Sequence, residues 1–327
     1  MRILFVDSGG LTFESRYAYG IYDTLSKDFV CDVRQISPFQ LSSHIINEFK
    51  PDLLLVIHGT FTPFHLVQYA KIKGAVTALW LVEDPYEIDY HRGQMVETYD
   101  YVFTTEKQAV KEYNRPNAFY LPWCCSPRIH NRLLFPPSYH SDVCLVGVAF
   151  PDRIRILNSI ASVIKDLNVK LIGNWGEELV PELRKFIIPV ICDLWEVQKY
   201  YCGAKINLNI HRSPTNPPSG NSKGIPGTSP NDRTFALAGS GAFQLVDSSR
   251  PDLWECFNIG RELIVFNDTK DLADKISEYL KHPEIRESIA TEGQQRAYRE
   301  HTFYHRLEEI FKKTGITTRI CNVKRSW

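Results

Sequence analysis

The chain has 327 residues, of which 43% are hydrophobic and 23% are charged; this balance is typical of globular proteins, and the length favours two domains. Its 38 basic and 38 acidic residues give a formal net charge of +0, which argues against nucleic acid or an anionic membrane surface as a partner. No apolar segment approaches the roughly 20 residues that span a bilayer, so no transmembrane segment is expected.

The eight cysteines form no C-x-x-C pair, which argues against a zinc ribbon or a thioredoxin-like site. We therefore expect reduced thiols and a cytoplasmic protein. Residues 1–7 have the pattern of a strand, and this segment is too short for a signal peptide before Gly9 and Gly10 follow.

The first half of the chain alternates short apolar segments with amphipathic ones. Because continuous apolar strands separated by helices are typical of a parallel sheet covered on both faces, we predict an α/β domain. The predicted strands are residues 2–6, 29–36, 53–57, 76–82, 101–104 and 118–121, and the predicted helices are residues 13–25, 41–49 and 63–73.

A proline-rich stretch at residues 122–141 separates this half from a second α/β alternation, and we place the domain boundary within it. The prediction is one Rossmann-like domain at 1–137, a second at 138–303, and a C-terminal helix and tail at 304–327. Parallel sheets bind ligands outside the carboxyl ends of their strands, so the expected site is a cleft that the two domains face. The second half has predicted strands at 142–148, 169–172, 204–210, 242–246 and 262–266, and predicted helices at 153–167, 194–201, 231–239, 253–256, 272–280, 284–299 and 304–313.

The strongest local signal is the stretch SPNDRT at 229–234, which precedes a predicted helix. Asn231, like Ser229, is a residue type that caps helices, and Pro230 suits a first helical turn. A helix N-terminus attracts anions, and Arg233 adds a forked positive charge suited to phosphate. The alternative is an ordinary capped helix with a solvated arginine. The candidate donor-binding residues here are Ser229, Asn231, Asp232, Thr234 and, from the preceding polar loop, Lys223.

Two strands of the second half end in residues that could face the same site. Gly147 ends the strand at 142–148, and Arg153 in the following helix could supply a second guanidinium; a plain strand-to-helix connection is the alternative. Asn209 and His211 lie at the end of another strand, where polar groups point into the crevice. His211 could equally be a structural histidine.

Gly173, Asn174 and Trp175 follow the strand at 169–172. The Trp175 ring could stack on a nucleobase or pack beneath the next helix. No G-x-G-x-x-G is present, so a nicotinamide or flavin site gains no support.

The strand ends of the first half would line the acceptor side. Gly9, Gly10 and Gly59 are candidate acceptor-side residues, and His58 or Asp84 could act as acid, base or orienting group for an acceptor. No aspartates have D-x-D spacing, so a magnesium–diphosphate site has no obvious ligands. We expect no metal and no cofactor, and leaving-group charge would then be neutralised by Arg, Lys and helix N-termini.

Taken together, several stretches resemble the CgeB/YkvP-like spore-protein glycosyltransferases, within the GT-B glycosyltransferases. The similarity covers most of residues 142–310, and in the first half it is carried mainly by DPYEID at 84–89. The similar stretches include DVCLVGVAFPDRIRILN at 142–158, KINLNIHR at 205–212 and SPNDRTFALAGSGAFQLVD at 229–247.

The resemblance implies a GT-B fold and glycosyl transfer without a D-x-D metal, with retention of the anomeric configuration. The second domain would bind a nucleotide-diphospho-sugar, and the first would bind a glycan, peptide or small-molecule acceptor. Arg233 and Arg153 would stabilise the departing nucleotide diphosphate, and His58 or Asp84 would orient the acceptor hydroxyl. Similar enzymes often end with a helix that crosses back onto the first domain, and residues 304–313 are the candidate.

One position departs from the family pattern. Similar proteins read R-x-F-E-x-x-x-x-G after the loop, and the Glu hydrogen-bonds the ribose; here Ala236 takes its place, and Thr228 takes the place of the other carboxylate of the E-x7-E pattern. A lost charged hydrogen bond costs roughly 1.5–3 kcal/mol, which weakens donor binding by about tenfold to a hundredfold. The alternative function is a catalytically degenerate GT-B module that binds nucleotide, glycan or a protein partner in spore or envelope assembly. A nucleotide-sugar epimerase is a third hypothesis, because that chemistry also uses two Rossmann-like domains.

Overall fold

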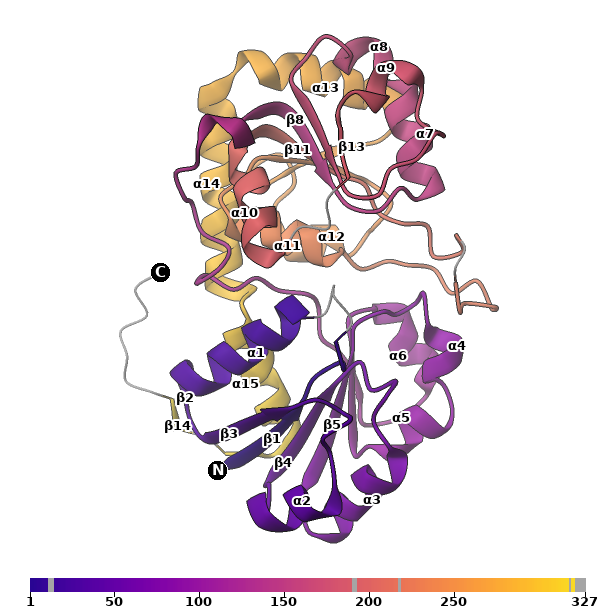
Figure 1. Ribbon diagram of the computed structural model, residues 1–327, viewed down its shortest axis with the longest axis vertical. Coiled ribbons are helices and arrows are strands. Elements are labelled where there is room, and N and C mark those ends of the chain that lie inside the picture. Colours follow the sequence, from indigo (N-terminus) through magenta and orange to yellow (C-terminus); the bar gives the residue numbers. More distant parts are fainter. Residues whose placement is uncertain (11–14, 190–192, 217–218, 318, 321–327) are drawn as a thin grey trace. The chain divides into compact units, whose positions relative to one another are not determined.

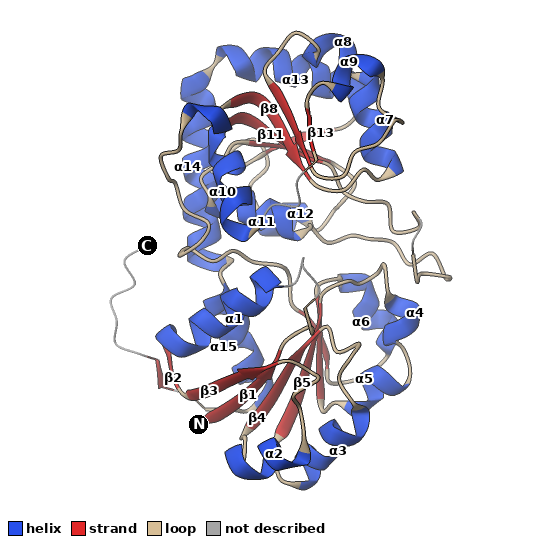
Figure 2. Cartoon of the chain, viewed as in Figure 1, coloured by secondary structure: helices blue, strands red, loops and turns tan. Residues whose placement is uncertain are grey.

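Two parallel sheets, each flanked by helices, form the frame of the protein. The computed structural model describes residues 1–10, 15–189, 193–216, 219–317 and 319–320. One unit groups Met1–Pro122 with Pro217–Gly227 and Phe303–Trp327, and the other groups Trp123–Asn216 with Thr228–Thr302. In each unit helices cover both faces of the sheet (Figure 1, Figure 2).

The first unit is built on six parallel strands in the order β3-β1-β4-β5-β6-β7. Its central strand β4 is apolar and buried at every position, as expected for a sheet covered on both faces. The strands are β1 (Arg2–Val6), β3 (Asp32–Ile36), β4 (Leu53–Ile57), β5 (Val76–Leu81), β6 (Tyr101–Thr104) and β7 (Ala118–Tyr120). The helices are α1 (Ser15–Asp28), α2 (Ser43–Phe49), α3 (Phe64–Ile72), α4 (Ile88–His91), α5 (Gln94–Thr98), α6 (Lys107–Tyr113) and α15 (Phe303–Thr314).

The second unit repeats this plan with the strand order β10-β9-β8-β11-β12-β13. Apolar residues of its strands and helices share one core, in which Leu145, Leu171 and Leu208 are almost fully buried. The strands are β8 (Ser141–Val146), β9 (Val169–Ile172), β10 (Ile187–Ile188), β11 (Ala204–Asn209), β12 (Gln244–Asp247) and β13 (Ile264–Phe266). The helices are α7 (Pro151–Ser159), α8 (Ala161–Ile164), α9 (Pro181–Arg184), α10 (Leu194–Gly203), α11 (Asp232–Gly239), α12 (Leu253–Cys256), α13 (Thr269–Lys281) and α14 (Pro283–Glu300), preceded by a 3-10 turn at Pro137–Tyr139.

Each sheet has one point at which the strand order reverses. In the first sheet β1 pairs directly with β4, and β3 lies on the other side of β1. In the second sheet β8 pairs with β11, and β9 lies on the other side of β8. Ligands of open α/β sheets bind at such switch points, outside the carboxyl ends of the strands.

The C-terminal helix α15 is part of the first unit, where it packs on α1. The ring of Tyr304 stacks on that of Phe29, with centroids 5.0 Å apart. The Nε of Arg306 donates to the carbonyl of Pro122 at 2.6 Å. A short antiparallel pair, β2 (Phe29–Val30) with β14 (Arg319–Ile320), lies beside this region.

The boundary between the units differs from the expected 137/138. Residues 123–137 belong to the second unit, because this segment bonds to it: the Cys125 N–H donates to the His301 carbonyl at 2.8 Å, and Gln198 Nε2 donates to the Asn131 carbonyl at 2.6 Å. Proline-rich composition marks an irregular connection but carries no information on which sheet the connection packs against.

The long polar loop, expected in the second domain, also divides between the units. Residues 219–227 lie in the first unit, where the Gly220 N–H donates to the Tyr86 carbonyl at 2.6 Å and the Asp89 N–H donates to the Gly220 carbonyl at 2.7 Å. The Ser222 N–H donates to the Asp89 carboxylate at 2.6 Å. These contacts are long in sequence separation, and local patterns do not reveal them.

Two long predicted elements are interrupted. The expected strand at 29–36 divides at Cys31 into β2 and β3, and the expected helix at 153–167 divides at Ile160 into α7 and α8. The short helices α4, α5, α6 and α9 were not predicted. Each has four to seven residues, about two helical turns at most, which is too few to show a helical period.

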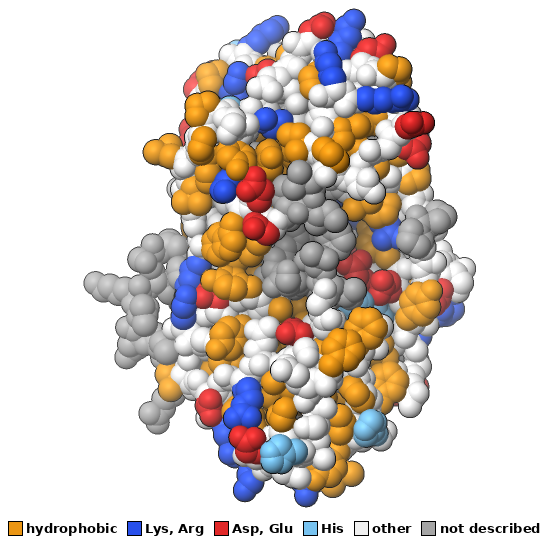
Figure 3. All heavy atoms as spheres, in the orientation of Figure 1, with side chains coloured by type: hydrophobic (Ala, Val, Ile, Leu, Met, Phe, Trp, Pro, Cys, Tyr) orange, Lys and Arg blue, Asp and Glu red, His pale blue; other side chains and the backbone are white. Residues whose placement is uncertain are grey.

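None of the described helices combines the length and the apolar character needed to cross a bilayer. Figure 3 shows basic and acidic side chains interspersed on the face that it presents. This distribution accords with a formal net charge of +0.

Candidate functional site

The switch point of the second sheet carries a hydrogen-bonded network that joins strands β11 and β12 to helix α11. His211, two residues past the end of β11, donates from its backbone N–H and from Nδ1 to Asp247 at 2.6 and 2.8 Å. Its Nε2 accepts from the Asn231 N–H at 3.3 Å. Because Nε2 faces a donor, Nδ1 carries the proton and the ring is held in one orientation.

The charges of this pair follow from burial. Burial lowers the pKa of His211 against the opposing effect of Asp247, so the ring is neutral at pH 7. Burial alone would raise the pKa of Asp247, but the charge interaction and hydrogen bonds from His211 hold it below its ordinary value. A neutral imidazole that accepts from Asn231 and donates to an ionised Asp247 is consistent with the lowered pKa values of both groups.

Helix α11 begins at Asp232, and Asn231 is its N-cap. The Asn231 Oδ1 accepts from the Thr234 N–H at 3.0 Å, and its Nδ2 donates to Asn209 Oδ1 at 2.9 Å. Asn209 Nδ2 in turn donates to the Thr234 hydroxyl at 2.9 Å. The first turn of the helix is therefore fixed to the end of β11, with its N–H groups at the carboxyl edge of the sheet.

Arg153 and Arg233 lie against the turn at Gly147, which follows β8. A Cβ added to Gly147 would lie 2.6 Å from Arg233 Nη2 and 3.0 Å from Arg153 Nη1. A Cβ on Gly173 would lie 2.4 Å from the Gly147 carbonyl oxygen. Only glycines fit where the ends of β8 and β9 meet under the two guanidinium groups.

Arg153 and Arg233 differ in how many of their guanidinium N–H donors are hydrogen-bonded within the protein. Arg153 is buried and donates to the carbonyls of Ile210 and Val148, each at 2.9 Å. Arg233 donates from Nη1 to Asn209 at 3.4 Å, and its buried Nε has no hydrogen-bond partner among the described residues. A guanidinium has five N–H donors, so Arg233 retains donors for an anionic ligand.

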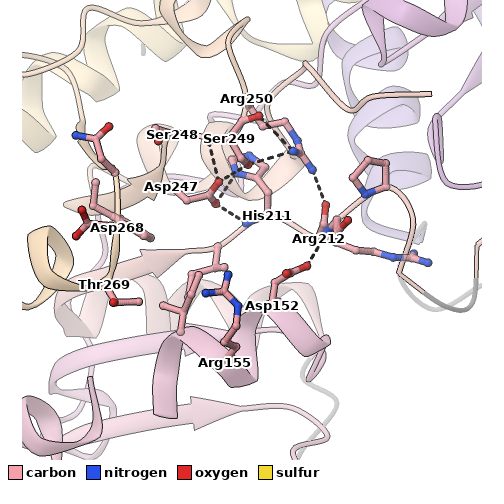
Figure 4. A pocket seen from close by; sticks show the side chains of 16 residues that line it. Asp152, Arg155, His211, Arg212, Asp247, Ser248, Ser249, Arg250, Asp268 and Thr269 are labelled. Carbon is pink, nitrogen blue, oxygen red and sulfur yellow. Dashed lines mark hydrogen bonds and ion pairs between the residues drawn. The ribbon is translucent and has the colours of Figure 1, made fainter. Parts of the chain in front are cut away.

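A pocket of about 480 Å³ adjoins this network through His211 and Asp247 (Figure 4). Arg250 donates to the Arg212 carbonyl, and Ser249 donates to the Asp247 carboxylate. The ring of His211 thus lies between the α11 N-terminus and a pocket with arginines along its wall. The residues that line it, from the ends of β11, β12 and β13 and from α7 and α13, include Asp152, Arg155, His211, Arg212, Ser213, Asp247, Ser248, Ser249, Arg250, Asn267, Asp268 and Thr269.

Sequence reasoning missed most of this pocket. Asp247 ends β12 as His211 follows β11, so the strand-end rule could have found it. Arg250 and Arg155 carry no such signal, because only the tertiary fold brings them beside β11.

Three donor-side expectations differ from the structure. Trp175 is 6% exposed and packs in the core of the second unit, so its ring is not available to stack on a base, while its neighbour Asn174 is exposed. Ser229 does not cap α11; its hydroxyl donates to Asp252 at 3.0 Å. Lys223 lies in the first unit, where its ammonium pairs with Glu112 at 2.9 Å.

The two positions where similar proteins carry carboxylates are occupied otherwise. Ala236 is 7% exposed and packs with Tyr201, Leu237 and Ala242. The Thr228 hydroxyl donates to Asp252 at 2.8 Å. Ala236 is therefore a packing position of α11 in this chain.

The first unit gathers its candidate residues at the ends of β1, β4 and β5. Gly9 and Gly10 follow β1 with φ of 80° and 95°, and Gly59 follows β4 with φ of 85°. His58 also has a positive φ, of 65°, and its N–H donates to the Trp80 carbonyl at 2.8 Å. These turns let the backbone leave the sheet sharply at its switch point.

Asp84 cannot serve as the exchangeable acid or base that we expected. It is buried, and one oxygen faces His91 Nδ1 at 2.7 Å while the other accepts from Thr104 at 2.5 Å and Tyr113 at 2.6 Å. Burial alone would raise the pKa of Asp84, but His91 and the two hydroxyls hold it below the ordinary value. Asp84 is thus an ionised anchor for His91.

His58 keeps a neutral ring beside this pair. Its Nε2 lies 3.5 Å from Glu87 Oε2, and burial, together with the nearby His91, lowers its pKa to about 4. Glu87 and His91 were not singled out from the sequence. The signal that could have found them is their four-residue separation in the stretch 87–91, which places both on one side of a helical turn.

Comparison with a family model and with solved structures shows which class of proteins this chain is similar to. A family model described as glycosyl transferase-like matches residues 153–312. Among solved structures, a glycosyltransferase from Rickettsia africae superposes with a TM-score of 0.64 at 10% identity, covering 96% of this chain and 97% of that one. The Anabaena protein HepE in complex with UDP-glucose gives 0.60 at 12% identity, covering 97% and 100%. The protein has a GT-B fold, which confirms the predicted fold class.

The sequence comparison then adds a curated relative. The chain is 27% identical over 301 residues to the spore protein CgeB of Bacillus subtilis (strain 168), covering 89% of this chain and 91% of that protein. This similarity confirms the resemblance to CgeB-like proteins that was expected from the sequence.

Proposed function

We propose that the protein transfers a sugar from a nucleotide-diphospho-sugar to an acceptor hydroxyl, with the diphosphate bound at the N-terminus of α11. The observation that carries the proposal is Arg233, whose donors are incompletely satisfied where the capped helix meets the carboxyl edge of the sheet. Helix N-termini and arginines are the groups that bind phosphate in proteins. The complex of HepE with UDP-glucose supports a donor of this class.

The proposed mechanism uses these groups on the leaving nucleotide diphosphate. Negative charge develops there as the glycosidic bond breaks, and Arg233 with the α11 N–H groups would stabilise it more in the transition state than in the ground state. Arg153 acts as a positioning residue, because its own donors bind the Ile210 and Val148 carbonyls. No D-x-D metal and no organic cofactor enters this scheme.

The adjoining pocket would hold another part of the donor. Its volume of about 480 Å³ lies in the range of small-molecule sites, and Arg155, Arg212 and Arg250 offer charge and hydrogen bonds along its wall. Asn209 and His211 belong to the donor site as the groups that fix helix and pocket to each other. Gly147 and Gly173 belong to it because their lack of side chains leaves room for the guanidinium groups of Arg153 and Arg233.

On the acceptor side we retain His58 with the glycine turns at Gly9, Gly10 and Gly59. The acceptor would be a glycan, a peptide or a small molecule with a free hydroxyl. Retention of the anomeric configuration, supported by the family resemblance alone, completes the proposal; the anomeric proton of the product reads it out by NMR. A cytoplasmic location, expected from the cysteine pattern, also stays part of the proposal.

A second candidate function rests on Ala236. Without the ribose-binding carboxylate, the chain would be a GT-B module that binds a nucleotide, a glycan or a protein partner without turnover, for example in spore assembly, as the likeness to the spore protein CgeB suggests. Calorimetry with a nucleoside diphosphate, followed by product analysis, separates the two functions. Binding with turnover supports the transferase, and binding without turnover supports the module.

The test begins with a thermal-shift screen of UDP, GDP, ADP, TDP and CMP, because a ligand of the folded state raises its apparent stability. The donors of the stabilising nucleotide are then assayed for hydrolysis and transfer. Arg233→Gln is compared with Arg261→Gln, a matched change at an exposed arginine of the same unit. Absence of nucleotide binding and of turnover with every donor would overturn the proposal.

A further inference from the structure

Three potential metal-binding side chains converge beside the switch point of the first sheet. His58 follows β4, Glu87 lies in the turn after β5, and His91 ends α4. Glu87 Oε2 is 3.5 Å from His58 Nε2 and 3.8 Å from His91 Nε2. All three candidate ligand atoms lie within 4.8 Å of one another.

A second and independent observation comes from His91. Its side chain is 0% exposed, and its Nε2 has no hydrogen-bond partner among the described residues. Its Nδ1 faces the carboxylate of Asp84 at 2.7 Å, so this contact occupies the Nδ1 side of the ring and leaves Nε2 for a metal ion. Nε2 faces the space beside Glu87.

The surroundings of His91 match those of metal-binding histidines. Such histidines almost always donate their second ring N–H to a carboxylate or carbonyl, which fixes the tautomer and the ring orientation. Asp84 supplies this carboxylate, and Thr104 and Tyr113 hold it in place through hydrogen bonds of 2.5 and 2.6 Å. The orientation of the His91 ring is therefore set by residues from α4, from the turn after β5, from β6 and from α6.

We propose that His58, Glu87 and His91 bind one divalent transition-metal ion of the zinc type, with Asp84 as the outer partner that orients His91. This proposal replaces the expectation of no metal ligands. It rests on contacts within the first unit and is independent of the proposed donor site.

The geometry and the ligand types select the ion. Zn–N and Zn–O bonds of about 2.0–2.2 Å in a tetrahedral site place ligand atoms roughly 3.4 Å apart. The Glu87 oxygen, at 3.5 and 3.8 Å from the two histidine nitrogens, needs only a small closure, which its 38% exposed side chain can make. The third pair, the two histidine nitrogens, also lies within 4.8 Å and has to approach as the ion binds. Two imidazoles suit zinc, cobalt or nickel, whereas magnesium and calcium prefer six or more oxygens. Three protein ligands also leave a fourth position for water or a ligand hydroxyl.

The experiment uses the full chain, stripped with a chelator and dialysed, then titrated with ZnCl₂ by calorimetry and with CoCl₂ by visible absorption. One ion per chain is expected, with the intense visible bands of tetrahedral cobalt. Glu87→Gln and His58→Gln should each weaken zinc binding at least about 100-fold, and Asp84→Asn should weaken it about 10- to 100-fold.

Matched controls are His44→Gln and His282→Gln, because both histidines are exposed and lie near a carboxylate. They should leave zinc affinity unchanged. Glu87→Gln changes a partly exposed side chain and should fold normally by circular dichroism, so it tests the site even if the buried Asp84→Asn variant does not fold. No binding at one ion per chain, or wild-type affinity in Glu87→Gln and His58→Gln, would overturn the proposal.

Discussion

In each of the two parallel sheets, the carboxyl ends of the strands form one edge, and these two edges have the same architecture but opposite chemistry. Each edge lies at a switch point between paired strands, β1 with β4 and β8 with β11. The second edge presents a capped helix and an arginine with unsatisfied donors. The first presents an anchored carboxylate, two histidines and Glu87. If the two proposals hold, strand topology selects where a ligand binds, and the residues after the strands select whether the ligand is an anion or a cation.

The largest expected effect is at Arg233. Arg233→Gln removes the charge that, in the proposed function, faces the leaving group, and it keeps a side chain of similar length. Loss of one preorganised donor to developing charge typically costs about 100- to 1,000-fold in kcat, and we expect this loss in donor turnover. Arg261→Gln should match the wild type. Equal kcat values in Arg233→Gln and the wild type would contradict the proposal that the second edge binds an anion through Arg233.

A smaller effect concerns the pH dependence of folding stability, which His58 causes at the first edge. His58 has a folded-state pKa of about 4, lowered mainly by burial from 6.5, so the unfolded chain takes up this proton at higher pH than the folded one. Stability is full above about pH 6.5 and falls as the pH decreases toward 4, by about 3 kcal/mol at 1.36 kcal/mol per pKa unit. Denaturant unfolding of the metal-free chain between pH 7 and 4 measures this.

His58→Gln should remove most of that decrease, while the exposed His44→Gln should retain it. Part of the slope will persist in His58→Gln because burial also lowers the pKa of His211. If the wild type and His58→Gln lose stability in parallel, the ring of His58 is not buried in its neutral form.

The smallest effect tests the network of the second edge. Asp247→Ala leaves the His211 backbone N–H and Nδ1–H without their acceptor, and an unsatisfied buried group costs about 1–3 kcal/mol. We expect a lower urea midpoint and weaker nucleotide binding, because His211 and Asn231 then lose their fixed orientation. Asp274→Ala, at an exposed position of α13, is the control. An unchanged midpoint with unchanged binding would show that Asp247 does not hold the site together.

Local patterns predicted the frame of the fold well. The apolar strands β1, β4 and β9 begin and end where the sequence pattern placed them, because burial on both faces of a parallel sheet leaves a continuous apolar run. Asn231 as a cap and the glycines at the ends of β8 and β9 follow from backbone chemistry that acts within a few residues.

What sequence reasoning missed depends on contacts between distant segments. Trp175 is buried in a core to which α7 and α9 also contribute. Both oxygens of Asp84 are hydrogen-bonded because Thr104 and Tyr113 reach it from β6 and α6 and His91 reaches it from α4. His91 lies in a four-residue helix, too short to show a period. The pocket arginines meet only when β11 pairs with both β8 and β12.

The central claim is that the α11 N-terminus and Arg233 bind the diphosphate of a nucleotide-sugar. Calorimetric titration of wild type and Arg233→Gln with UDP, UMP and uridine, or with the matching series of whichever nucleotide stabilises the chain, tests it most directly. The account predicts that affinity falls from diphosphate to nucleoside in the wild type. It also predicts that Arg233→Gln weakens binding of the diphosphate while leaving binding of the nucleoside unchanged. Equal weakening of diphosphate and nucleoside by Arg233→Gln, or no binding of any nucleoside diphosphate, would contradict it.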